Sequence, residues 1–298
     1  MKLSDFTYLG ITVEKDAEFE CACKTKDMPP KGKYLLFIEN GEIDVSAFGH
    51  IHRVTAVITT RQLRDKFISE DFGLAVCDNP KAAFIKICNG IKVERRDDAT
   101  AVGTGCSIAN TADVPGFGVR IGNNVVIEDN VKLYSGVIIG DDCVIGRGAV
   151  LGCANYERCF DDNGAYVRAE HKGMLKIGNG VTIGENTMID KALFDWDSTE
   201  IGDGCYIGRG SDISHGCKIC EKSVIAHRVC ICGNAVVGTG AKISAGAIVS
   251  NRVKIGEGAI VSIGSVVNKD VEACCRVTGN LAVPHDKHLA MLKKITSE

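Results

Sequence analysis

Two of the seven histidines stand at equivalent places in a six-residue pattern, and one of them has neighbours suited to acyl transfer. His215 and His227 each follow a repeat aliphatic residue by two positions, a phase that lies at a corner or outer face. If residues 18 apart stack, Gly233 lies above His215 and Asn251 lies above Gly233. A histidine beside a glycine N–H combines a general base with an oxyanion donor, the minimum for acyl transfer.

A long hexapeptide repeat between Ile201 and Val267 must position these residues. Every sixth residue of this stretch is a β-branched aliphatic, which amphipathic patterns of period 2 or 3.6 do not produce. Such a repeat predicts a parallel β-helix, in which three hexads form one triangular coil. Residues 18 apart in sequence therefore stack about 4.8 Å from one another along the axis. The series is Ile201, Ile207, Ile213, Ile219, Ile225, Ile231, Val237, Ile243, Val249, Ile255, Val261 and Val267.

The extent of the repeat divides the chain into three parts. We expect an N-terminal α/β domain over 1–98, a β-helix over 99–283 and a short C-terminal helix over 284–298. Two excursions interrupt the β-helix, one at 152–176 and a smaller one near 191–200. The predicted class is therefore mainly β, a left-handed parallel β-helix of hexapeptide repeats with a small N-terminal α/β domain. The left hand is carried over from the known class of hexapeptide helices.

Short buried strands and a helix are expected in the N-terminal part. The helix over 81–89 follows Asn79, has Pro80 in its first turn and stops at Gly90. No Gly-rich phosphate loop accompanies these elements, which favours a recognition domain over a Rossmann unit. In the first excursion, the Asp-Asp-Asn-Gly sequence at 161–164 predicts a hairpin turn. The expected strands are Tyr34–Ile38, Val54–Thr59 and Leu74–Val76.

Composition limits the classes of function. The 298-residue chain is 24% charged with a formal net charge of −3, which argues against nucleic-acid binding and against an electrostatic membrane anchor. The first residues contain no apolar signal segment, and no apolar run reaches transmembrane length. We therefore expect a cytoplasmic protein without integral membrane contact.

A metal site is the alternative use of the histidines, because some hexapeptide-helix proteins are trimeric carbonic anhydrases with three histidine ligands. His215 and His227 are 12 positions apart, so they lie at different corners of a coil and cannot share an ion within one subunit. No third histidine occupies a matching position. We therefore expect no metal site.

The fifteen cysteines could also suggest zinc or disulfides. A CxxC pair begins at Cys217 and a CxC pair at Cys230, but no second CxxC lies at zinc-finger spacing. However, four cysteines, Cys217 among them, occupy the slot two residues before a repeat aliphatic, where a thiol acts as a small buried hydrophobe. These are Cys106, Cys143, Cys205 and Cys217. The sequence therefore favours cysteines that pack over cysteines that bind metal.

Three blocks of the chain resemble the UDP-3-O-acylglucosamine N-acyltransferase family of lipid A biosynthesis. Leu-Leu-Phe-Ile-Glu-Asn at 35–40 and Asp-Asn-Pro at 78–80 are similar to that family's uridine-binding domain. Ile-Gly-Glu-Asn-Thr-Met-Ile-Asp-Lys at 183–191 resembles its mid-helix signature, and Ile-Ser-His at 213–215 its catalytic-histidine strand. Thr-Gly-Asn-Leu-Ala-Val-Pro-His at 278–285 is similar to the motif before its C-terminal helix.

This resemblance implies an N-acyltransferase of the lipid A type. His215 would be the general base that deprotonates the 2-amino group of a UDP-linked, 3-O-acylated glucosamine, and the Gly233 N–H would hold the oxyanion. The implied acyl donor is an acyl-carrier-protein thioester, with a CoA thioester left open, and no other cofactor is implied. The family is homotrimeric, with active sites in clefts between neighbouring prisms.

The resemblance also implies residues that bind the nucleotide. Phe37 matches a uracil-stacking aromatic, and Asn40 matches a polar contact to the uridine. Where the family has a second stacking tyrosine, this chain has Ile43. Tyr156 retains the aromatic of a glycine–aromatic–glycine motif whose glycines are absent here.

Three further residues are predicted around the column of His215. Arg252 stands where the family has a second histidine, and its guanidinium can meet a phosphate. Asn251 is a predicted substrate contact at the top of the column. Asp197, one coil before His215 if the register continues, is the predicted carboxylate that orients the base.

Two alternatives remain beside the lipid A type reaction. The first is an acetyl-CoA-dependent acetyltransferase acting on a nucleotide-linked amino sugar, on the same scaffold. The second is a non-catalytic hexapeptide scaffold, in which His215 would have no chemical role.

Overall fold

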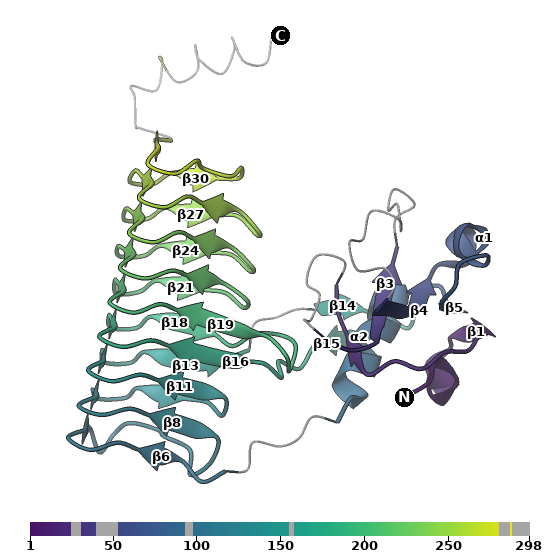
Figure 1. Ribbon diagram of the computed structural model, residues 1–298, viewed down its shortest axis with the longest axis horizontal. Helices are drawn as coiled ribbons and strands as arrows, with labels where there is room; N and C mark the ends of the chain where they lie inside the picture. Colours follow the sequence, from purple (N-terminus) through teal and green to yellow (C-terminus); the bar gives the residue numbers. More distant parts are fainter. Residues whose placement is uncertain (25–30, 40–52, 93–97, 155–157, 280–286, 288–298) are drawn as a thin grey trace. The chain divides into compact units, whose positions relative to one another are not determined.

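The computed structural model describes residues 1–24, 31–39, 53–92, 98–154, 158–279 and 287, shown in Figure 1. The chain forms two compact units. Unit 1 comprises Met1–Asp97, Ala154–Met174 and Lys191–Ser198, and unit 2 comprises Asp98–Cys153, Leu175–Asp190 and Thr199–Glu298. The chain therefore leaves unit 2 twice, in the two regions where the hexapeptide pattern is interrupted.

Unit 1 contains a five-stranded sheet in the order β1-β5-β4-β3-β2. The strands from β2 to β5 pair in parallel, and β1 is antiparallel to β5. Every residue of β5 is buried, as expected for a parallel strand covered on both faces. The strands predicted from sequence are confirmed. The elements are η1 (Leu3–Leu9), β1 (Thr12–Lys15), β2 (Cys21–Ala22), β3 (Tyr34–Ile38), β4 (Val54–Thr59), η4 (Arg61–Leu63), α1 (Arg64–Phe67), β5 (Gly73–Val76) and α2 (Pro80–Gly90).

Helix α2 is held at both ends by side chains. Asn79 caps its N-terminus, where Oδ1 accepts a 3.0 Å hydrogen bond from the Ala82 N–H, as the Asn-Pro sequence predicts. At the other end, the Lys172 ammonium donates to the carbonyls of Cys88, Asn89 and Ile91 at 2.7, 2.8 and 2.6 Å. A cation at these orphan carbonyls also favours the helix dipole. The first excursion thus stabilises the helix of unit 1.

The first excursion folds as the predicted hairpin. Strands β14 (Arg158–Phe160) and β15 (Tyr166–Arg168) pair antiparallel. Asp161 Oδ1 accepts from the Asn163 and Ala165 N–H groups at 3.1 and 3.0 Å, which closes the turn. Gly164 adopts φ +74°, a left-handed conformation that glycine tolerates. An ion pair of 2.8 Å between Lys86 and Asp161 ties the hairpin to α2.

Unit 2 is a β-helix of three parallel sheets, whose strands stack one above another in Figure 1. The first sheet contains β10 (Lys132–Leu133), β13 (Val150–Cys153), β18 (Met188–Asp190), β21 (Asp212–Ile213), β24 (Cys230–Ile231), β27 (Ile248–Val249) and β30 (Val266–Val267). The second contains β6 (Ala101–Val102), β8 (Val119–Ile121), β11 (Val137–Ile139), β16 (Met174–Ile177), β19 (Ser198–Ile201), β22 (Lys218–Ile219), β25 (Val236–Val237) and β28 (Lys254–Ile255). The third contains β7 (Ser107–Ile108), β9 (Val126–Ile127), β12 (Val144–Ile145), β17 (Thr182–Ile183), β20 (Tyr206–Ile207), β23 (Val224–Ile225), β26 (Lys242–Ile243), β29 (Ile260–Val261) and β31 (Arg276–Val277).

The register between strands confirms that one coil takes three hexads over the regular part of the repeat. Ile213 pairs with Ile231, which pairs with Val249. The repeat aliphatics from Ile201 to Val267 are all buried and form one continuous core. Each fully buried aliphatic side chain contributes roughly 1.5–3 kcal/mol of hydrophobic stabilisation before entropy is subtracted.

The two excursions lengthen the coils in which they occur, and the register shows by how much. Leu151 pairs with Ile189, so the coil that contains the first excursion is more than twice as long as a regular one. Ile189 pairs with Ile213, which is four hexads further along the chain and not three. Counting back from His215 in steps of three hexads is therefore wrong below β21.

Cysteines fill the predicted small slots inside the prism. Cys143, Cys205 and Cys217 are buried. Their thiols lie 3.1, 3.0 and 3.1 Å from the carbonyl oxygens of Gly178, Cys220 and Cys232, so each has a hydrogen-bond acceptor. Burial raises the pKa of the Cys217 thiol to about 12, which keeps it protonated. These cysteines pack as hydrophobes and donate to the backbone.

The predicted fold class is confirmed: unit 2 is a hexapeptide β-helix, and unit 1 is a small α/β domain. Of the predicted C-terminal helix, only Lys287 lies within the described residues. Within the described part of the chain, no helix is long and apolar enough to cross a membrane.

Candidate active site

His215 and Gly233 follow consecutive strands of the first sheet of unit 2, β21 and β24. The register of these strands places the two residues at the same turn, one coil apart. The Asn234 N–H donates to the His215 carbonyl at 2.9 Å, and the Arg252 N–H donates to the Gly233 carbonyl at 3.0 Å. The backbone therefore holds the column of His215, Gly233 and Asn251 in step.

Gly233 lies directly against the imidazole of His215. A Cβ atom added to Gly233 would come within 2.9 Å of Cε1 and 3.0 Å of Nε2 of the ring. Real Cβ atoms do not approach other heavy atoms so closely, so only glycine fits without displacing the histidine. Its φ is not in the left-handed region. Close approach, and not a turn conformation, is the reason that glycine is required here.

The Gly233 N–H lies two residues after a repeat aliphatic, at a turn where backbone N–H groups do not take part in the hydrogen bonds between strands. At the equivalent turn of another corner, the N–H groups of Asn123, Asp141 and Asn179 donate to side-chain oxygens of the next coil at 2.7, 2.9 and 2.7 Å. Among the residues that the structure describes, no hydrogen bond from the Gly233 N–H is found. This donor is therefore available to an oxygen that approaches the histidine.

Asp190, which is not among the residues predicted from the sequence, is a carboxylate below His215. It ends β18, is 6% exposed, and accepts a hydrogen bond from the His215 backbone N–H. Its Oδ1 also lies 3.2 Å from the Cys153 thiol. Burial, and next to it the like charge of Asp212, raises the pKa of Asp190 to about 6, although both hydrogen bonds favour the ionised form. The signal in the sequence is Met-Ile-Asp at 188–190, which lies within the block at 183–191 that resembles the family's mid-helix signature.

Asp197, the predicted orienting carboxylate, belongs to unit 1 and not to the coil below His215. Its Oδ1 accepts the Ser198 N–H at 2.7 Å. The expectation that it lies one coil below His215 is wrong because the second excursion adds one hexad to that coil. Its role as the orienting carboxylate stays a prediction.

The other predicted contacts of unit 2 lie above Gly233. Asn251 is exposed, and Arg252 is half-buried with φ +64° at the next turn. Both are close to the column in sequence and register, and their contacts with substrate stay predictions.

Phe37, the predicted base-stacking residue, lines a small apolar pocket within unit 1. It is half-buried on β3 and packs against Phe84 of α2, with ring centroids 4.8 Å apart. Lys24 and Lys81 contribute only their apolar stems to the lining of this pocket. The pocket residues include Lys24, Phe37, Lys81, Phe84, Cys88 and Leu193. The predicted partners Asn40 and Tyr156 lie outside the described residues.

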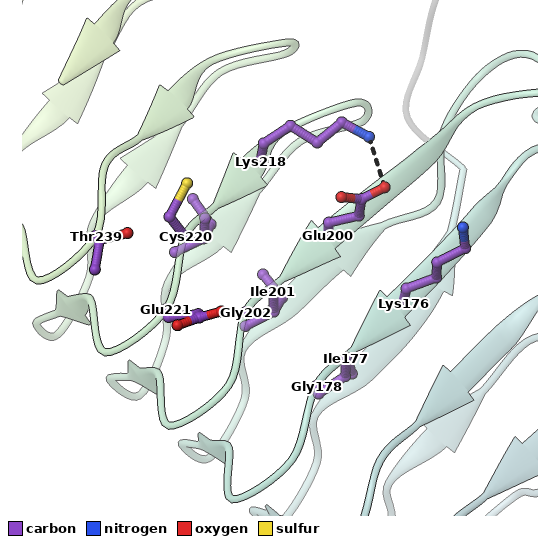
Figure 2. A pocket seen from close by; sticks show the side chains of 11 residues that line it. Lys176, Ile177, Gly178, Glu200, Ile201, Gly202, Lys218, Cys220, Glu221 and Thr239 are labelled. Atoms are coloured by element: carbon purple, nitrogen blue, oxygen red, sulfur yellow. Dashed lines mark hydrogen bonds and ion pairs between the residues drawn. The ribbon is translucent and has the colours of Figure 1, made fainter. Parts of the chain in front are cut away.

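A second hollow lies on the outer face of unit 2, over β16, β19 and β22 of the second sheet (Figure 2). Figure 2 shows Lys218 reaching toward Glu200, with which it forms an ion pair of 3.0 Å, while Lys176 projects from the strand below. This open groove does not include His215. It has charged residues but no base beside an oxyanion donor.

His227 occupies a different environment from His215. It is exposed, follows β23 of the third sheet, and meets the edge of the Tyr206 ring at 6.5 Å between ring centroids. Throughout the described ranges, no three or more His, Cys, Asp or Glu side chains converge in a group that could hold a metal ion.

Part of the repeat is similar to the repeats of known bacterial transferases. A family model described as "Bacterial transferase hexapeptide (six repeats)" matches residues 118–153. The chain is 29% identical over 141 residues to UDP-3-O-acylglucosamine N-acyltransferase of Helicobacter pylori strain ATCC 700392 / 26695, covering 40% of this chain and 42% of that protein. It is 31% identical over 161 residues to the protein of the same name from Coxiella burnetii strain Dugway 5J108-111, covering 44% and 46%.

A solved structure of a UDP-N-acetylglucosamine acyltransferase from Bacteroides fragilis has 20% identity and a TM-score of 0.49, covering 64% of this chain and 71% of that one. Residues 118–153 thus carry hexapeptide repeats of the kind found in bacterial transferases. Within that class the chain is similar to the UDP-3-O-acylglucosamine N-acyltransferases, and this resemblance, predicted from sequence, is confirmed. The chain spans less than half the length of the curated relatives that it matches.

Proposed function

We propose that the protein is an N-acyltransferase that moves an acyl group from an acyl-carrier-protein thioester to the 2-amino group of a UDP-linked, 3-O-acylated glucosamine. The observation that carries this proposal is the imidazole of His215 lying against Gly233, with 2.9–3.0 Å to a Cβ placed on the glycine. The names of the relatives supply the substrate class.

His215 acts as the base through Nε2. Its Nδ1 is buried, so a substrate reaches the ring from the other nitrogen. The imidazole takes a proton from the amine as the nitrogen attacks the thioester carbonyl, and a C–N bond forms. The imidazolium then returns a proton to the leaving thiolate as the C–S bond breaks. The proton taken from the amine thus ends on the thiol, and the electron pair of the broken C–S bond ends on sulfur.

Gly233 stabilises the charge that develops on the carbonyl oxygen. A backbone N–H held rigidly in place needs no reorganisation when the tetrahedral intermediate forms. Its position one coil above the base puts donor and base on adjacent strands, about 4.8 Å apart along the axis. This spacing lets one carbonyl carbon meet the attacking amine while its oxygen meets the amide.

Unit 1 binds the nucleotide in this proposal. The half-buried ring of Phe37 offers a face for the uracil, and Lys24 and Lys81 attract the diphosphate. Stacking on an aromatic side chain contributes about 1–3 kcal/mol per base. Arg252, Asn251, Asn40 and Tyr156 are proposed as further substrate contacts.

The proposal includes a homotrimer in which neighbouring prisms flank each active site. Its support in this chain is an apolar column on the outer face of the third sheet. Val126, Val144, Tyr206 and Val224 are each 37–39% exposed, and they occupy strands that pair in register, with Thr182 between them. A flat apolar column suits packing against another β-helix.

Because acyl-carrier-protein and CoA thioesters are made and used in the cytoplasm, the proposal places the protein there.

A product assay tests the proposed function. Purified protein is incubated with 3-O-acyl-UDP-glucosamine and either acyl-carrier-protein thioesters or CoA thioesters of different acyl lengths, and the products are analysed by mass spectrometry. The expected product is the N-acylated UDP-sugar from a long-chain carrier-protein donor. Product from short CoA thioesters alone would support the acetyltransferase alternative, and no product from any donor would support a scaffold.

A further inference from the structure

Three side chains at or just after the ends of successive strands form a column below Gly233. Cys153 ends β13, Asp190 ends β18, and His215 follows β21 at the same side of the prism. The β13–β18 register shifts between Leu151 and Cys153, and this irregularity sets Cys153 opposite Asp190. Such bulges re-aim a side chain. The order from bottom to top is therefore thiol, carboxylate, imidazole and glycine.

Hydrogen bonds run upward through this column. The Cys153 Sγ lies 3.2 Å from Asp190 Oδ1. Burial, and next the charge of Asp190, raises the pKa of the Cys153 thiol to about 12, so the thiol keeps its proton and donates. The Asp190 carboxylate in turn accepts the backbone N–H of His215. The main chain that carries the imidazole is thus anchored from below by a buried carboxylate.

Both exits of the chain from unit 2 occur directly after the lower members of this column. Residues 154–174 and 191–198 belong to unit 1, so the coils of Cys153 and Asp190 do not continue into a regular turn there. In the regular coils above, the turn is held by backbone bonds such as Asn234 N–H to His215 O, 2.9 Å. Below His215, where the chain leaves unit 2, a side-chain carboxylate, that of Asp190, accepts the backbone N–H of His215.

We propose that Asp190 is a positioning residue for His215, whose carboxylate fixes the backbone of the histidine below Gly233 and whose negative charge favours the imidazolium. This inference rests on the proposed function for its catalytic consequence, but the effect on the histidine itself is independent of it. A buried anion next to the main chain of a base stabilises the protonated base as it takes the proton of the amine. The groups that face Asp190 are Cys153 on β13, Asp212 on β21 and the His215 backbone.

A purely structural role for Asp190 is the competing explanation. Under that explanation, an asparagine, which retains an oxygen acceptor for the His215 N–H, would leave the histidine unchanged. Under the proposal, the loss of charge changes the histidine even when the fold is retained. The two explanations therefore differ in the titration of His215 and not only in stability.

The test is an NMR titration of the histidine ring carbons in the wild type and in Asp190→Asn. The His215 signal is assigned by its loss in His215→Ala. We expect the pKa of His215 to fall by about one unit in Asp190→Asn, as removal of a nearby opposite charge requires. Asp203→Asn is the matched control, because Asp203 also accepts a backbone N–H, from Asn179 at 2.7 Å, but lies at another corner. It should leave the His215 pKa unchanged.

Kinetics add a second readout. Asp190→Asn should lower kcat about threefold to tenfold, because only part of a one-unit change in the pKa of the base appears in the rate, with KM for the UDP-sugar little changed. Cys153→Ala removes the thiol that donates to Asp190 but keeps the carboxylate. Because this hydrogen bond favours the ionised form, its loss should raise the pKa of Asp190 and move the acidic limb of the pH–rate profile to higher pH. This variant serves if Asp190→Asn folds poorly.

Two results would overturn the inference: a His215 pKa in Asp190→Asn that is indistinguishable from the wild-type value, or a Cys153→Ala profile identical to wild type. If the wild type transfers no acyl group to any amine, the proposed function fails. The NMR titration would still decide whether Asp190 acts on His215.

Discussion

The buried carboxyl group of Asp190 should make the stability of the protein depend on pH in a predictable direction. Replacing Asp190 by asparagine removes the titrating group while keeping the side-chain shape. The perturbation therefore isolates the protonation of one group. Burial disfavours the ionised form of Asp190, yet this form is the one proposed to position His215. The variant therefore also tests whether Asp190 lowers the stability of the fold at the pH where its charge is present.

The magnitude follows from the raised pKa. Burial raises the pKa of Asp190 from 3.8 to about 6, so the folded state binds this proton more tightly than the unfolded chain does. A raised carboxyl pKa stabilises the fold at low pH, and the contribution is lost as the pH rises through about 6. At about 1.36 kcal/mol per unit, the contribution is about 1.4 kcal/mol at pH 5 and about zero at pH 8.

The assay is equilibrium unfolding in urea at pH 5 and pH 8, with wild type and Asp190→Asn at equal protein concentration. The difference between their free energies of unfolding should change by about 1.4 kcal/mol, in favour of the wild type at pH 5. A difference that is the same at both pH values, or that changes in favour of the wild type at pH 8, would refute the reasoning about burial.

Three further variants test other parts of the account. Gly233→Ala should lower kcat about 10²–10³-fold because its Cβ would displace the His215 ring, whereas Gly116→Ala, with open space around it, should not. Phe37→Ala should raise KM for the UDP-sugar about tenfold and leave kcat unchanged, with the exposed Phe160→Ala as control. Val144→Glu should dissociate a trimer in sedimentation experiments, whereas Val102→Glu on another sheet should not; an intact Val144→Glu trimer would exclude the apolar column as the interface.

The hexapeptide spacing was sufficient to predict the column of His215 and Gly233. Since each regular coil takes three hexads, the stacking of two residues is a matter of counting, and Ile213, Ile231 and Val249 pair as counted. The chemistry of glycine and histidine at this spacing then suggested the site. Local sequence was also enough for the strands and helix of unit 1, where buried runs and the Asn79 cap are local signals.

The carboxylate below the base could not be predicted in the same way. The second excursion adds one hexad to the coil, so counting back three hexads from His215 reaches Asp197 in unit 1 and not a residue of the column. The length of an excursion is set by how its residues pack, which the repeat does not encode. Similarly, the support of α2 by Lys172 joins segments that are far apart in the sequence, and no pattern in either segment indicates it.

The most direct test of the central claim is the ratio of kcat/KM between His215→Ala and His227→Ala for acyl transfer to the amino sugar. The two histidines occupy the same repeat phase, but only His215 lies against a glycine in the manner of Gly233. Loss of a general base predicts a fall of about 10²–10⁴-fold for His215→Ala and near wild-type activity for His227→Ala. Equal activity of the two variants would contradict the claim that His215 and Gly233 form the catalytic site.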